Sequence, residues 1–85
     1  MSIKIKEGML YIHKDQITNF KNGEGPDPFN INNKLYYVVM SVTPYNFSNN
    51  TTGLIIEYRH VTDQELYIRT LKHFESAFTP LHKGE

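Results

Sequence analysis

Apolar and polar positions alternate through residues 35–74, and this pattern predicts the centre of the fold. Period-two alternation is typical of a strand with one buried face. Residues 34–43 predict the first strand. Its more consistently apolar face, which we expect to point inward, comprises Tyr36, Val38, Met40 and Val42. The outward set comprises Leu35, Tyr37, Val39 and Ser41. Because this set is also mostly apolar, we expect a central strand that is covered on both sides.

A second strand is predicted after a polar hairpin loop at residues 44–52. Residues 53–60 form this strand, and its expected inward face consists of Leu54, Ile56 and Tyr58. Its outward face consists of Ile55, Glu57 and Arg59. The two strands together predict an antiparallel pair with one buried face.

The meander is expected to close at residues 65–74. A third strand at residues 65–70 has two expected inward side chains, Leu66 and Ile68. Its outward side chains are Tyr67 and Arg69. A helical turn follows, and it spaces Leu71 and Phe74 three positions apart, so both can face the core.

The residues before the meander predict a bent strand and a short helical turn. Residues 3–13 alternate in two runs separated by Gly8, which predicts one bent strand or two short strands. In residues 14–20, Asp15 is in position to cap a helical turn. A helix this short needs tertiary contacts, and we expect Phe20 to supply them by packing on the sheet.

A long loop and a final edge strand complete the expected fold. Residues 22–33 contain Asn-Gly and two prolines, which predict a loop with Phe29 and Ile31 as its anchors. Residues 78–81 predict a last short strand, which Pro80 confines to a sheet edge. Residues 82–85 are a polar tail.

The fold class that follows is mainly β. We expect residues 1–85 to form a single small domain of about five strands with one short helical turn, either an SH3-like barrel or a strongly bent antiparallel meander. The chain has no cysteine, so disulfides and thiolate metal sites are excluded. It has no apolar run of export-signal or membrane-span length, and we expect a cytoplasmic protein.

Residues 67–74 resemble a known signature. The run Tyr-Ile-Arg-Thr-Leu-Lys-His-Phe is similar to the aromatic-valine-arginine-proline-leucine-x-x-phenylalanine block of an uncharacterised family of small bacterial and phage domains. Residues 54–58 and 33–39 resemble two further strands of that family, while Thr70 stands where the family has proline. The resemblance implies an SH3-like barrel. It implies no activity, because none is established for the family.

The sequence contains no recognisable catalytic constellation. The four histidines lack metal-ligand spacing, and the closest carboxylates, Asp63 and Glu65, flank a turn. The glycines near residue 24 lack the lysine and helix of a phosphate loop. We therefore expect a protein that is not an enzyme and takes no cofactor, metal or small-molecule substrate.

What remains is a surface rich in tyrosine and arginine, the residue types enriched at binding hot spots. The expected partner-binding residues are Tyr37, Tyr45, Phe47, Arg59, His60, Tyr67, Arg69 and Lys72. In the simplest interpretation these aromatic residues only pair across the sheet and cover a small cluster beneath the loop at residues 22–33.

Three binding functions stay open from the sequence. The first is a phage or mobile-element accessory protein that binds and modulates a host protein, for example a defence or toxin component. The second is a single-stranded RNA-binding module, since aromatic and arginine side chains stack on unpaired bases. Nine basic and nine acidic residues cancel, which argues against a protein that coats duplexes. The third is a homo-oligomer joined through a strand edge or an apolar face.

Overall fold

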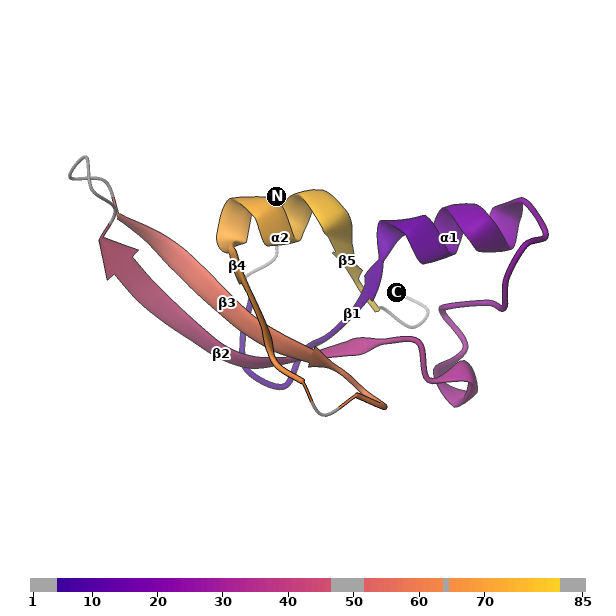
Figure 1. The fold of residues 1–85 in the computed structure, drawn as a ribbon, viewed down its shortest axis with the longest axis horizontal. Coiled ribbons are helices and arrows are strands. Elements are labelled where there is room, and N and C mark those ends of the chain that lie inside the picture. The colour runs from indigo at the N-terminus through magenta and orange to yellow at the C-terminus, as the bar shows by residue number, and fades with distance from the viewer. Residues whose placement is uncertain (1–4, 47–51, 64, 82–85) are drawn as a thin grey trace.

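A computed structural model describes residues 5–46, 52–63 and 65–81, and in these residues the chain forms one five-stranded antiparallel sheet with two α-helices (Figure 1). The elements are β1 (Leu10–His13), α1 (Lys14–Lys21), the 3₁₀ helix η1 (Ile31–Asn33), β2 (Tyr37–Asn46), β3 (Thr52–His60), β4 (Tyr67–Thr70), α2 (Leu71–Ala77) and β5 (Phe78–Pro80). The strand order is β4-β3-β2-β1-β5. The mainly β expectation is confirmed. The SH3-like barrel is not confirmed, because β4 and β5 are the two edges of the described sheet and do not pair with each other.

A β-bulge in β2 determines which of its side chains reach the core. Val39 lies opposite Tyr58, but the next pair is Ser41 with Glu57, so Met40 is an extra residue in β2. Val39 is 1% exposed and Met40 is 38% exposed. The predicted inward face of β2 is therefore wrong before the bulge. After the bulge Val42 packs against the core as expected, because the extra residue shifts the alternation by one position.

The predicted orientation of β4 is also wrong. Tyr67 lies opposite Tyr58, and Arg69 lies opposite Ile56. Directly opposed residues in an antiparallel pair share a face, so Tyr67 and Arg69 lie on the core side of the sheet. Ile68 lies opposite Glu57 on the other face and is 64% exposed.

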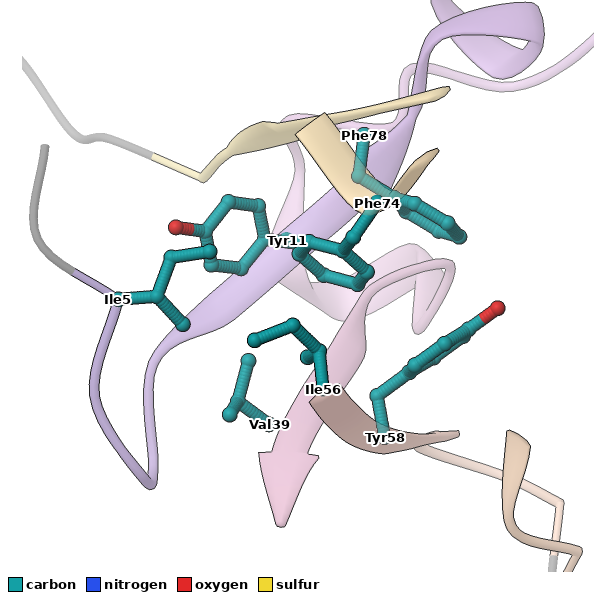
Figure 2. Close-up of a cluster of buried hydrophobic side chains, with 7 residues drawn as sticks. All are labelled: Ile5, Tyr11, Val39, Ile56, Tyr58, Phe74 and Phe78. Atoms are coloured by element: carbon teal, nitrogen blue, oxygen red, sulfur yellow. The ribbon is translucent and has the colours of Figure 1, made fainter. Parts of the chain in front are cut away.

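The core lies between the sheet and α2. Thr70 caps α2 by accepting a hydrogen bond from the backbone amide of His73 at 3.3 Å. Phe74 is fully buried, and Leu71 packs against the core, as the three-residue spacing predicted. Figure 2 shows the buried cluster, which consists of Ile5, Tyr11, Val39, Ile56, Tyr58, Phe74 and Phe78. The chain then continues into β5, which pairs with β1 at the sheet edge and contains Pro80, as expected.

The helix α1 is longer and less buried than the sequence suggested. His13, not Asp15, is its N-cap: Nδ1 of His13 accepts from the Asp15 amide at 3.1 Å, and Gln16 Oε1 accepts from the His13 amide at 3.1 Å. This reciprocal capping box satisfies two backbone donors. None of the residues of α1 is buried, and Phe20 is 43% exposed, so its expected packing on the sheet is wrong.

The anchor of the loop at residues 22–33 is Pro28. This proline is fully buried, whereas the expected anchors Phe29 and Ile31 are exposed. Asp27 and Asn30 instead accept hydrogen bonds from backbone amides two residues further on, each at 3.0 Å. These turns shape the loop with local polar contacts, so it does not need its larger apolar side chains as anchors.

The β2–β3 ribbon extends well beyond α2 and gives the molecule its elongated outline of 45 × 28 × 23 Å (Figure 1). The last four residues of β2 are all exposed. The α1 helix lies at the opposite end of the long axis. Among the described residues, neither α-helix is long and apolar enough to span a bilayer.

Candidate interaction surface

The expected partner-binding residues are distributed over several parts of the structure. Those on the core face of the sheet are Tyr37, His60, Tyr67 and Arg69. Arg59 lies on the opposite face, because it pairs with Val38. Tyr45 lies in the distal β2–β3 ribbon, and Lys72 lies in the first turn of α2. Phe47 is outside the described residues. The structure thus brings four of these residues to one face and separates the others from them.

Tyr58 is the centre of the core-face group. It is 3% exposed, and its ring stacks on that of Tyr67 with centroids 5.5 Å apart and an interplanar angle of 28°. Its hydroxyl accepts a hydrogen bond of 2.8 Å from Nε of Arg69. A buried side chain therefore holds two exposed ones in a defined position.

Asp63 orients Tyr67 from the other side. The Tyr67 hydroxyl donates to Oδ2 of Asp63 at 3.0 Å, while Oδ1 accepts from the Glu65 amide at 3.2 Å. The hydrogen bond to Asp63 is the main cause that raises the pKa of Tyr67 above its usual value. Tyr67 therefore remains a neutral hydrogen-bonding side chain at physiological pH.

Tyr37 and His60 support this group from β2 and from the end of β3. The Tyr37 ring meets Tyr58 edge-on at 5.8 Å and His60 at 4.8 Å. Burial is the main cause that raises the pKa of Tyr37. Nδ1 of His60 accepts from the Thr62 amide at 3.2 Å, which holds the turn after β3. Tyr37 thus packs against Tyr58, the residue that contacts both Tyr67 and Arg69.

The outer edge of β4 is an exposed feature that the sequence analysis missed. In the described residues β4 pairs only with β3, and its other edge has no strand beside it. Ile68 in β4 is 64% exposed, and Leu66, which immediately precedes β4, is 53% exposed. The charged residues Glu65 and Arg69 flank these two in the chain. The period-two alternation instead predicted that these two apolar residues point inward. The pairing of Ile68 with Glu57, which no local pattern reveals, shows the opposite.

Arg59 forms a separate feature on the far face of the sheet. Its Nε is buried and has no hydrogen-bond partner among the described residues. The neighbouring Glu57 accepts from the Ser41 hydroxyl at 2.9 Å instead. We assign Arg59 no part in the surface around β4, because the sheet separates the two.

The hollow beside α2 holds no acid–base pair. This hollow of about 250 Å³ lies between the first residues of β3 and the junction of β4 with α2. Its lining residues are Thr52, Gly53, Leu54, Thr70, Leu71 and Lys72. Lys72 is the only titratable side chain among them, so no acid–base pair converges there. Over residues 5–46, 52–63 and 65–81, no three metal-ligating side chains cluster in a way that would hold an ion.

Comparisons with protein-family models, with curated proteins and with solved structures gave no match to this chain. The resemblance of residues 67–74 to an SH3-like family therefore stays a prediction, and the surface has to be interpreted from its own geometry.

Proposed function

We propose that this protein is a non-catalytic protein-binding module whose partner docks on the outer edge of β4. The observation that carries the proposal is Ile68, a large apolar side chain that is 64% exposed on an edge strand. Edge strands present free backbone donors and acceptors, and extended segments of other chains pair with them. The exposed Leu66 beside Ile68 adds apolar area, which favours a protein partner.

The polar residues of this edge also favour a protein. Tyrosine and arginine contribute strongly to binding when they are preorganised, and Tyr67 and Arg69 are both held by Tyr58. Following the sequence analysis, we propose a cytoplasmic partner, a host protein if the chain is encoded by a phage.

Single-stranded RNA is the second candidate, supported by the partly exposed ring of Tyr67 next to Arg69. Three features weigh against it. One face of the Tyr67 ring is already stacked on Tyr58, and the carboxylates of Asp63 and Glu65 lie beside it in the chain. Arg59 is on the other face of the sheet, so the expected basic patch is divided.

The test is affinity capture from host lysate with two matched variants. Ile68→Asp places a charge on the β4 edge, and Ile31→Asp places one on η1, where the isoleucine is 46% exposed outside the sheet. We expect the wild type and Ile31→Asp to retain the same protein partner, and Ile68→Asp to lose it. Capture that is indifferent to Ile68→Asp would exclude the β4 edge as the binding site. RNA in the captured material that depends on Arg69 but not on Ile68 would support the second candidate instead.

A further inference from the structure

We infer that a second copy of this chain can occupy the β4 edge, paired antiparallel about a twofold axis at Tyr67. This inference rests on the proposed function, since it names the partner of the same edge. The main evidence for it is the order of residues 65–69, which is Glu-Leu-Tyr-Ile-Arg. All five residues are exposed.

This segment is complementary to itself when it runs antiparallel. A twofold axis at Tyr67 places Glu65 opposite Arg69 of the second copy and Arg69 opposite Glu65. The same axis places Leu66 opposite Ile68, again twice, and Tyr67 opposite its own counterpart. Opposite charges and apolar side chains that face each other across strands are the pairs that stabilise antiparallel ladders. A closed twofold contact uses one surface patch on both copies, as this pattern requires.

The faces of the sheet are consistent with this register. Tyr67 and Arg69 lie on the face that α2 covers, and Ile68 lies on the other face. Glu65 and Leu66 immediately precede β4, so the proposed pairing extends the strand by these two residues, and continued alternation then places Glu65 on the face of Tyr67 and Leu66 on the face of Ile68. A twofold axis perpendicular to the sheet keeps each face on its own side. The charged pairs then lie on the α2 side, and the leucine–isoleucine pairs lie on the uncovered side. Moving the axis to Ile68 would place Arg69 opposite Tyr67, and the charge complementarity would be lost.

The other end of the sheet is a poorer site for such pairing. The edge strand β5 has three residues and includes Pro80, which has no backbone donor. Pairing through β4 would instead join two five-stranded sheets into one continuous sheet. A contact of five residues from each copy buries less surface than standard interfaces, which bury roughly 1,200–2,000 Å². We therefore expect a weak, concentration-dependent dimer.

The decisive experiment uses charge reversal and sedimentation equilibrium of the purified full chain over a concentration series. Glu65→Arg gives a chain with two positive charges at the contact, and Arg69→Glu gives one with two negative charges. We expect each variant alone to dimerise at least tenfold more weakly than the wild type. A mixture of the two variants should recover dimers, because both positive side chains of the first variant then face the negative side chains of the second.

Two further measurements test whether the weaker dimerisation comes from charge repulsion and not from unfolding. Circular dichroism must show both variants folded, since Arg69→Glu removes the hydrogen bond to Tyr58, whereas the exposed Glu65 side chain is replaced without such a loss. The double variant Glu65→Arg/Arg69→Glu restores both charge pairs between two identical copies, with the signs exchanged, and should dimerise like the wild type. A wild type that stays monomeric at millimolar concentration overturns the inference. So does a mixture that gains no dimer over its separate components.

These outcomes separate this inference from the proposed function. A monomeric wild type whose capture of a lysate protein still depends on Ile68 would refute the second copy and keep the binding module. A dimer that dissociates in Ile68→Asp, with no partner in the lysate, would support self-association as the function of the edge.

Discussion

Truncating Phe74 to alanine should remove a large part of the stability of this protein. The Phe74 side chain is fully buried, and its ring lies 4.6 Å from that of Phe78, 4.9 Å from Tyr11 and 5.1 Å from Tyr58. Removing a buried phenylalanine costs about 3–5 kcal/mol, through lost apolar burial and the cavity that remains. The three ring contacts add to the usual burial term and favour the upper half of that range.

This loss is large compared with the total. At about 0.05–0.15 kcal/mol per residue, a chain of 85 residues has a free energy of unfolding of roughly 4–13 kcal/mol. Phe74→Ala would therefore remove between a third of the stability and nearly all of it. Because Phe74 fixes α2, and α2 directly follows β4, the same change should loosen the β4 edge.

Urea unfolding followed by circular dichroism measures the effect. With a slope of about 1–3 kcal/mol per molar urea, the midpoint should fall by about 1 M or more. The matched control is Phe20→Ala on α1, where the side chain is 43% exposed and the expected change is within about 0.5 kcal/mol. A loss below about 1 kcal/mol for Phe74→Ala, or equal losses for both variants, would refute the described core.

Two smaller predictions test the backbone and the pH dependence. Gly8 has a φ of +87°, and no atom lies within 4 Å of the position that a Cβ would take. Gly8→Ala should therefore lower the free energy of unfolding by about 1–2 kcal/mol through backbone strain alone. Gly25→Ala should cost clearly less, since Gly25 has no such φ and its Cβ would meet Asn19 at 3.6 Å; equal urea midpoints for the two variants would contradict this. Burial raises the pKa of Tyr11 and Tyr37 above 10.0, which favours their neutral form in the folded state. The contribution of these two neutral tyrosines to the free energy of unfolding is therefore complete below about pH 10. It is lost as the pH rises through the raised pKa values, so urea midpoints should fall above about pH 10. The double variant Tyr11→Phe/Tyr37→Phe should show a smaller fall, and an unchanged pH profile would reject the assignment.

Local sequence patterns predicted the strands of the meander and part of its core. Leu54, Ile56 and Tyr58 share one face of β3, while the other face carries the charged side chains of Glu57 and Arg59, which are costly to bury. Phe74 lies three positions after Leu71 in a helical turn, which directs both toward the same side. Pro80 excludes a central position for the last strand. Each of these inferences depends on residues close together in the chain.

The orientation of β2 and β4 required the tertiary structure. Both faces of β2 are apolar, so its alternation cannot distinguish inside from outside, and the extra residue Met40 then shifts it. In β4 the apolar Ile68 lies on the face away from the core. Pairing with β3 places Tyr67 on Tyr58, where ring stacking and a hydrogen bond to Asp63 orient it, and so leaves Ile68 exposed.

For the candidate surface, the sequence by itself determined the composition: tyrosines and arginines on adjacent strands, without a catalytic or metal-binding pattern. Only the tertiary structure decided which of them share a face, because a face depends on cross-strand register between residues far apart in the chain. That register places Tyr67 and Arg69 on one face, places Arg59 on the other face, and leaves Ile68 exposed on the edge strand β4, next to the exposed Leu66 that precedes the strand.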